Sequence, residues 1–245
     1  LEEGVASTAQ IDSIACKAFD IGMGPFALMN LTGSSIALHA TDYLAHQLNT
    51  PRYKGASNLR EMVANNKEWE IDNNIEYSES VRKIVEERLL GQVFAVASQI
   101  VDEEICSKED VDRGAKVGLR WNKGPFELAN KIGINRAFEI SKEYCELANL
   151  KIPNLLKTQK ESSKPFNFSY VDVIISKDVA TVRLNRPEAM NALNVDLVKE
   201  LGQKIDDLND RDDIKAIILE GSGKAFVAGA DVKFFVDKIK ENSFQ

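Results

Sequence analysis

The sequence predicts a multi-domain protein in which an all-α tandem repeat is followed by an incomplete α/β domain. Two observations point to this fold class. A block of residues recurs without a gap at a displacement of 100, between residues 3–33 and 103–133, and such a recurrence is the signature of a repeated structural module. Beyond Pro153 the apolar spacing changes from helical to mixed, in the order strand, strand, helix, strand, helix.

Composition narrows the class of protein. The 245 residues are 44% hydrophobic and 28% charged with a net charge of −7, so we expect a folded protein that binds neither nucleic acid nor a membrane surface. No apolar run reaches the roughly 18 residues of a membrane span. The scattered Cys16, Cys106 and Cys145 indicate free thiols in a reducing compartment, hence a cytoplasmic location. The two histidines, His39 and His46, cannot form a metal site by themselves, and we expect no metal.

The repeated block is clearest around a Gly-Pro-Phe triplet. Residues 24–33 read GPFALMNLTG and residues 124–133 read GPFELANKIG, so Gly, Pro, Phe, Leu, Asn and Gly all recur. Upstream, Asp12 matches Asp112 at the same displacement. We therefore expect two copies of one helical module.

A long amphipathic segment, Val81–Glu104, precedes the shared part of the second copy, with apolar residues at helical spacing. In the first copy Leu1 falls opposite Val101, so the equivalent helix is not present. We interpret the first copy as cut within that helix. The alternative is a domain that naturally lacks it.

Within each copy, Ser7 and Ser107 occupy N-cap positions, with Gln10 and Asp110 three residues on as imperfect capping boxes. The Gly-Pro-Phe triplets suit helix starts, because proline is tolerated at the first helical position. A turn-and-core role for the triplets is favoured over a catalytic one, with four side chains directed inward: Phe26, Leu28, Phe126 and Leu128.

Three polar residues of the repeat also need an interpretation. His39 lies on an apolar stretch and is favoured as a hydrogen-bonded helix residue over a ligand. Asn30 and Asn130 are expected to cap a helix or to bridge the two copies.

The domain boundaries follow from these patterns. We place the first helical copy at 1–78, the second at 79–156, a polar linker at 157–166 and the α/β part at 167–245. In the last part we expect strands, a helix and a loop of small residues that leads into a final helix: Tyr170–Ser176, Val179–Leu184, Asn191–Leu208, Ile214–Leu219, Glu220–Asp231 and the helix from Val232.

Two motifs in the α/β part resemble a known family. The stretch 184–193 (LNRPEAMNAL) followed by 224–231 (KAFVAGAD) resembles the enoyl-CoA hydratase (crotonase) superfamily, over about the first third of a crotonase domain. The helical copies resemble the C-terminal substrate and dimerisation domains of 3-hydroxyacyl-CoA dehydrogenases, over about residues 1–150. Together they resemble a fused 3-hydroxyacyl-CoA dehydrogenase/enoyl-CoA hydratase.

The crotonase resemblance implies site residues in the loop of small residues. Ala230 would supply one backbone N–H of an oxyanion hole, and Ala228 and Gly229 would shape the loop. Asp231 would cap the following helix beside the bound substrate, and Lys233 would meet the phosphates of coenzyme A. The alternative is a plain strand-to-helix loop.

The sequence departs from the crotonase pattern at one position. Glu188 stands where crotonases often carry lysine near the nucleotide of the cofactor. A carboxylate repels phosphate, so the nucleotide contacts are expected to shift to Lys233, Arg186 or Lys224.

The resemblance implies a bifunctional enzyme. Hydration of a crotonyl-CoA-like 2-enoyl-CoA would give (S)-3-hydroxyacyl-CoA, which NAD would oxidise to 3-oxoacyl-CoA. The second oxyanion donor, the catalytic glutamates, the dehydrogenase His–Glu pair and the NAD site would lie outside this chain, so the chain alone is expected to be inactive. The alternatives are a non-catalytic dimerisation or structural module, and a crotonase-fold isomerase or hydrolase. We expect a homo-oligomer assembled through the helical and crotonase-like domains.

Overall fold

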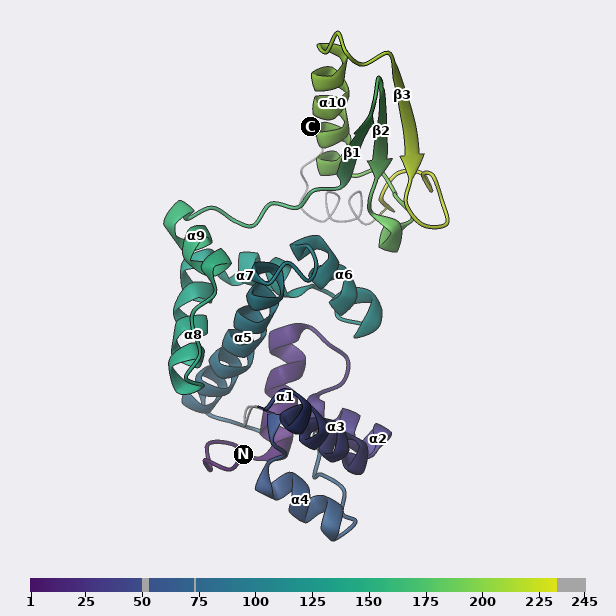
Figure 1. Ribbon diagram of the computed structural model, residues 1–245. Coiled ribbons are helices and arrows are strands. Elements are labelled where there is room, and N and C mark those ends of the chain that lie inside the picture. The colour runs from purple at the N-terminus through teal and green to yellow at the C-terminus, as the bar shows by residue number, and fades with distance from the viewer. Residues whose placement is uncertain (50–52, 73, 233–245) are drawn as a thin grey trace. The chain divides into compact units, whose positions relative to one another are not determined.

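Figure 1 shows the computed structural model, which describes residues 1–49, 53–72 and 74–232. The chain divides into two compact units, Leu1–Phe166 and Asn167–Gln245. The first is helical, and the described residues of the second form a small sheet with an α-helix beside it. Each unit has its own buried apolar core. None of the described helices combines the length and the apolar character that crossing a membrane requires.

The helical unit contains the same series of four helices twice. The helices have 12, 8, 14 and 8 residues in the first series and 11, 8, 14 and 9 in the second. This order agrees with the tandem repeat predicted from the sequence. The two series are α1 (Thr8–Phe19), α2 (Pro25–Thr32), α3 (Ser34–Gln47) and α4 (Ser57–Ala64), then α6 (Lys108–Gly118), α7 (Pro125–Ile132), α8 (Ile134–Leu147) and α9 (Asn154–Ser162).

Helix α5 (Glu79–Asp102) packs against α1, α7, α8 and α9 and forms the centre of the helical unit. It begins after Ser78, whose hydroxyl accepts the N–H of the third helical residue. Gly91 permits a close approach to α8, because a Cβ there would lie 2.4 Å from the carbonyl oxygen of Ile140. The two helices lie side by side in Figure 1.

The serine and the aspartate that occur in both copies of the repeat cap helices. Ser7 and Ser107 accept the N–H groups of Gln10 and Asp110, as predicted. The residue Asp12 on α1 then reaches the start of α2, where it accepts the N–H groups of the two residues that follow Pro25 at 2.7 and 2.8 Å. Asp112 does the same for α7 at 2.8 and 3.0 Å.

The repeated asparagines have a different role from the predicted one. The Asn30 side chain exchanges two hydrogen bonds with the backbone of Trp69, and Asn130 exchanges two with the backbone of Phe166. The expectation that they cap a helix or bridge the copies is wrong. Each side-chain amide instead binds a backbone segment downstream of its own repeat helices. It can do so because it has both a donor and an acceptor for the N–H and C=O groups of one residue.

The predicted linker at 157–166 is also wrong. Residues 157–162 belong to α9, and Leu156 on the same helix is 3% exposed. Phe166 is 4% exposed and its ring lies 4.8 Å from that of Phe126. The polar composition that indicated a linker is the solvent face of an amphipathic helix, so the second copy continues past the predicted end at 156.

The inward packing expected for the triplets holds only in the second copy. Phe126 and Leu128 are 2% and 1% exposed, whereas Leu28 is 50% exposed and Phe26 is half-buried. The physical reason is α5, which packs on α7 in the second copy, whereas α2 packs on α1 and α3 among the described helices.

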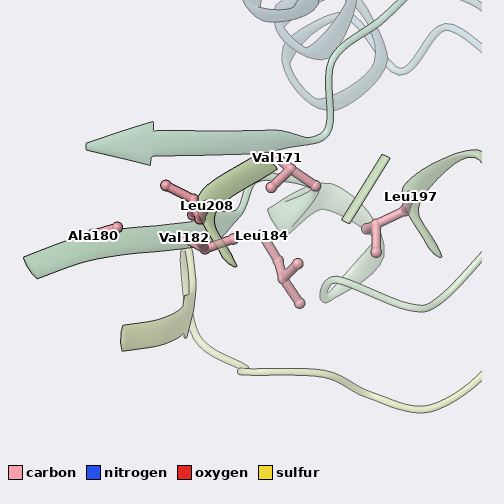
Figure 2. Packing of buried hydrophobic residues seen from close by; sticks show 6 residues of the cluster. All are labelled: Val171, Ala180, Val182, Leu184, Leu197 and Leu208. Carbon is pink, nitrogen blue, oxygen red and sulfur yellow. The ribbon is translucent and has the colours of Figure 1, made fainter. Parts of the chain in front are cut away.

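The second unit is a sheet in the order β1-β2-β3, formed by Val171–Ser176, Val179–Leu184 and Ala216–Gly221. The hairpin β1–β2 is antiparallel, and β2 pairs parallel to β3 after a crossover through α10 (Val195–Asn209). Figure 2 shows the buried core of this unit: Val171, Ala180, Val182, Leu184, Leu197 and Leu208. A short 3-10 helix, Pro187–Ala189, follows β2 and begins the segment that positions the candidate site.

Candidate functional site

A parallel β-bridge joins the small-residue loop after β3 to the segment before α10. Leu193 donates its N–H to the carbonyl oxygen of Gly229 at 2.8 Å, and Asp231 donates its N–H to the carbonyl oxygen of Leu193 at 2.9 Å. These two bonds form a parallel bridge between Leu193 and Ala230. In such a bridge the residue between the two bonded groups directs its own N–H to the opposite side. The Ala230 N–H therefore points away from Leu193.

This N–H is a free donor within the part of the chain that the structure describes. Ala230 is exposed, and its N–H has no acceptor among the described residues. The neighbouring Ala228 differs, because its N–H bonds to the carbonyl oxygen of Met190 at 3.0 Å. A fixed backbone N–H can stabilise negative charge that develops on a bound oxygen. Ala230 is thus a loop donor that the bridge fixes in direction and leaves available to a ligand.

Gly229 sets the course of the loop beside Ala230. Its φ is +107°, a conformation that residues with a side chain rarely adopt. Its carbonyl oxygen is the acceptor of the Leu193 bond. The roles of Ala228 and Gly229 toward a substrate stay predictions.

Asn191 binds the beginning of the same loop through hydrogen bonds. The sequence did not identify this residue as part of the site. Its side chain is fully buried, donates to the carbonyl oxygens of Ser222 and Ala225 at 2.9 and 2.7 Å, and accepts the N–H of Arg186 at 2.9 Å. Its φ of 53° lies in the left-handed region, which asparagine tolerates better than most residues. The signal in the sequence was an asparagine within an otherwise apolar stretch.

Two residues of the predicted substrate site, Arg186 and Asp231, contact each other. Arg186 Nη1 lies 2.7 Å from the Asp231 carboxylate and also donates to the carbonyl oxygen of Ala192 at 3.1 Å. The side chains are 18% and 13% exposed, so the pair is mostly removed from solvent. The helix that Asp231 was predicted to cap, and Lys233, lie outside the described residues.

The other predicted residues are found in three different elements. Glu188 is in the 3-10 helix, and Lys224 is exposed in the turn that follows β3. His39 is exposed on α3, with its ring 6.5 Å from that of Tyr43. Within residues 1–49, 53–72 and 74–232, no group of His, Cys, Asp and Glu has the arrangement of a metal site.

A perturbed carboxyl lies in the helical unit. Burial raises the pKa of Asp112 from its ordinary value of 3.8 to about 6, while the N–H groups of Phe126 and Glu127 oppose that rise. Asp112 is a cap of α7, and this explains its burial without a catalytic role.

Comparison with known proteins accounts for both units. The model of the family "3-hydroxyacyl-CoA dehydrogenase, C-terminal domain" matches residues 1–70 and 85–162, one stretch for each helical copy. The chain belongs to this family. The model "Enoyl-CoA hydratase/isomerase" matches residues 179–245, which contain the bridge and the loop described above. The resemblance to a dehydrogenase C-terminal domain joined to a crotonase-type domain is therefore confirmed.

Curated relatives carry hydratase names. A probable enoyl-CoA hydratase of Mycobacterium bovis is 41% identical over 31% of this chain and 30% of its own length. A short-chain-enoyl-CoA hydratase of Clostridium acetobutylicum is 47% identical over 25% of this chain and 24% of its own length. A crotonyl-CoA hydratase of Syntrophomonas wolfei is 42% identical over 27% of this chain and 26% of its own length. The chain thus spans less than a third of the length of each of these relatives.

The dehydrogenase family implies a nicotinamide dinucleotide, and the described residues do not fit it. Pyrophosphate binding at a βαβ crossover requires a glycine-rich turn that leads to an open helix N-terminus. Here the turn from β2 to α10, residues 185–194, contains no glycine. The N-terminus of α10 is already capped, because the Asn194 side chain accepts the Leu197 N–H at 2.9 Å.

Proposed function

We propose that the chain is part of a bifunctional enzyme that hydrates a 2-enoyl-CoA to a 3-hydroxyacyl-CoA and oxidises that product with NAD. The observation that carries the proposal is the N–H of the exposed residue Ala230, which is directed away from its bridge partner Leu193. It lies in the stretch that matches the hydratase model, downstream of two copies of the dehydrogenase C-terminal domain. The names of two relatives support crotonyl-CoA as the test substrate.

The chemical role proposed for Ala230 is to stabilise the thioester oxygen. Addition of water to a 2-enoyl thioester places negative charge on that oxygen, and an aligned N–H stabilises the charge in a site sheltered from water. Hydration also requires a carboxylate that activates water and an acid that protonates the α-carbon. The proposal assigns these groups, a second N–H donor and the NAD site to residues other than those described.

A direct test observes the Ala230 amide by NMR. The ¹⁵N-labelled chain is titrated with crotonyl-CoA and, separately, with coenzyme A, which has no acyl oxygen. We expect crotonyl-CoA to shift the Ala230 amide proton and coenzyme A to leave it in place. Ala228 is the internal control, because its N–H already bonds to Met190. No response of Ala230 at millimolar crotonyl-CoA would refute the assigned role.

A turnover assay tests the assignment of the missing groups. We expect the 245-residue chain neither to hydrate crotonyl-CoA nor to reduce acetoacetyl-CoA with NADH, because one N–H donor without an acid and a base does not complete either reaction. Removal of a single oxyanion donor already costs about 10²–10³ in rate. Spectrophotometric turnover of either substrate by this chain would contradict the assignment.

We also propose that the helical unit associates with a second copy of itself. Large apolar side chains are exposed on α2 and α3, among them Leu31 at 70%, Ile36 at 63% and Tyr43 at 57%. The substitution Leu31→Glu is expected to shift the chain toward monomer in sedimentation velocity, whereas Leu147→Glu, at 70% exposure on α8, serves as the matched control. A wild-type chain that is monomeric at micromolar concentration would refute the association.

A further inference from the structure

We propose that Arg186 is a positioning residue for the Ala230 amide and acts through Asp231 and Ala192. The inference rests on the function proposed for Ala230. It assigns Arg186 a role inside the protein in place of a contact with the phosphates of coenzyme A.

One nitrogen of Arg186 bonds to both chain segments that form the bridge between Leu193 and Ala230. Arg186 Nη1 donates to the carbonyl oxygen of Ala192 at 3.1 Å and to the Asp231 carboxylate at 2.7 Å. Ala192 precedes Leu193 on one side of the bridge, and Asp231 follows Ala230 on the other. Arg186 therefore joins the two bridged segments right beside the bonds that hold them together.

The bridge in turn fixes the direction of the donor. The carbonyl group of Gly229 and the N–H of Ala230 belong to one peptide group, and in a trans peptide they point in opposite directions. Because the Gly229 oxygen accepts from Leu193, the Ala230 N–H stays directed outward as long as the bridge is closed. Any opening of the bridge releases this peptide group to rotate.

Arg186 is itself fixed, as a positioning residue must be. Its backbone N–H donates to the Asn191 side chain at 2.9 Å, and its carbonyl oxygen accepts the Asn191 N–H at 2.9 Å. Its guanidinium group lies 5.9 Å from the centre of the Tyr170 ring. The pair with Asp231 is mostly buried, and a buried charge-assisted hydrogen bond is less screened than one at the surface.

The test measures the bridge in the full 245-residue chain without any ligand. Amide hydrogen exchange is followed at Leu193 and Asp231, the two donors of the bridge, and residual dipolar couplings report the direction of the Ala230 N–H. The variants are Arg186→Met, Arg186→Lys and Asp231→Asn. The matched control is Arg183→Met, which removes an arginine whose Nε lies 2.6 Å from Glu220 on the neighbouring strand.

We expect Arg186→Met to accelerate exchange at Leu193 and Asp231 by about tenfold or more, the order that follows from losing a charge-assisted hydrogen bond. The Ala230 coupling should change with it. Arg186→Lys should lie nearer to the wild type, because its ammonium group retains the charge and the donors. Arg183→Met should leave the two amides unchanged. Exchange at Val182, in the core of the sheet, should stay constant in every variant.

Three results would overturn the inference: exchange within twofold of the wild type in Arg186→Met, an equal acceleration in Arg183→Met, or a loss of protection that includes Val182. If Arg186→Met fails to fold, Asp231→Asn decides, since it retains the side-chain shape and removes the charge. All these measurements are made without thioester. They therefore fail or succeed independently of the crotonyl-CoA titration that tests the role of Ala230.

Discussion

The carboxylate of Asp112 accepts the backbone N–H of Phe126 at 2.8 Å and so closes the start of α7. Asp12 holds the same position at the start of α2. The first turn of a helix leaves N–H groups without intrahelical acceptors, and a carboxylate at that end satisfies them. Asp112 forms this cap although it is only 2% exposed. Its burial raises the pKa of the carboxyl group, whereas the hydrogen bonds from the helix N–H groups lower it.

The first prediction concerns the dependence of stability on pH. Burial raises the pKa of Asp112 to about 6, so the folded chain binds a proton more tightly there than the unfolded chain does. The contribution of this carboxyl to stability is therefore greatest below about pH 4 and falls as the pH rises to about 6. The fall amounts to as much as about 3 kcal/mol. Urea unfolding between pH 4 and 7 measures it.

Asp112→Asn removes the titration and is expected to remove this fall from the pH profile. Asp12→Asn makes the same change at the equivalent cap of α2 and serves as the matched control. An unchanged profile in Asp112→Asn would assign the pH dependence to other groups and contradict the prediction.

The second prediction tests the contact between α5 and α8. A Cβ at Gly91 would lie 2.4 Å from the carbonyl oxygen of Ile140, so Gly91→Ala forces the helices apart. We expect a loss of about 1–3 kcal/mol in the free energy of unfolding, the usual effect of overpacking. At Gly114, inside α6, a Cβ meets nothing within 4 Å, and Gly114→Ala is expected to stabilise by about 1 kcal/mol. Two stabilising substitutions would refute the close approach.

Much of this fold could be predicted from the sequence, because its signals are local. The serine caps and the turn between the first two strands depend on residues a few positions apart, and the repeat is visible by direct comparison of residues 24–33 with 124–133. The errors concern long-range contacts. The sequence around α9 is mostly polar, so the buried side of this helix, which includes Leu156, was not recognised. The exposure of Leu28 depends on whether a helix distant in the sequence covers α2. No local pattern carries that information.

The candidate site divides in the same way. The motif around Ala230 could be recognised in the sequence. The pairing of Arg186 with Asp231 could not, because it depends on the bridge between Leu193 and Ala230, two residues that are 37 positions apart in the chain. The apolar stretch around Asn191 indicates that this asparagine is buried, but its acceptors Ser222 and Ala225 lie more than 30 positions away and no local pattern identifies them. Both become apparent only when the loop is seen folded against the segment before α10.

The third prediction concerns the end of the second helical copy. Asn130 exchanges hydrogen bonds of 2.8 and 2.7 Å with the backbone of Phe166, so Asn130→Ala removes both. We expect a loss of about 1–3 kcal/mol, together with faster amide exchange at Phe166. Asn122→Ala is the control, because exposed Asn122 makes one bond to the carbonyl oxygen of Asp20 and its loss should cost at most about 1 kcal/mol. Equal effects would contradict the prediction.

The last prediction concerns whether the two units unfold independently of each other. Asn191 is fully buried and donates to the carbonyl oxygens of Ser222 and Ala225, so Asn191→Asp replaces two donors by a carboxylate facing two acceptors. An unpaired buried charge costs more than a neutral hydrogen bond contributes, and a loss of about 3 kcal/mol or more is expected in the sheet unit. Native-state amide exchange measures this at Val182 for the sheet and at Phe94 for α5. Because Asn167–Gln245 forms its own compact unit, we expect Val182 to lose protection and Phe94 to retain it. Equal losses at both amides would mean that the two units unfold together, and would refute the prediction.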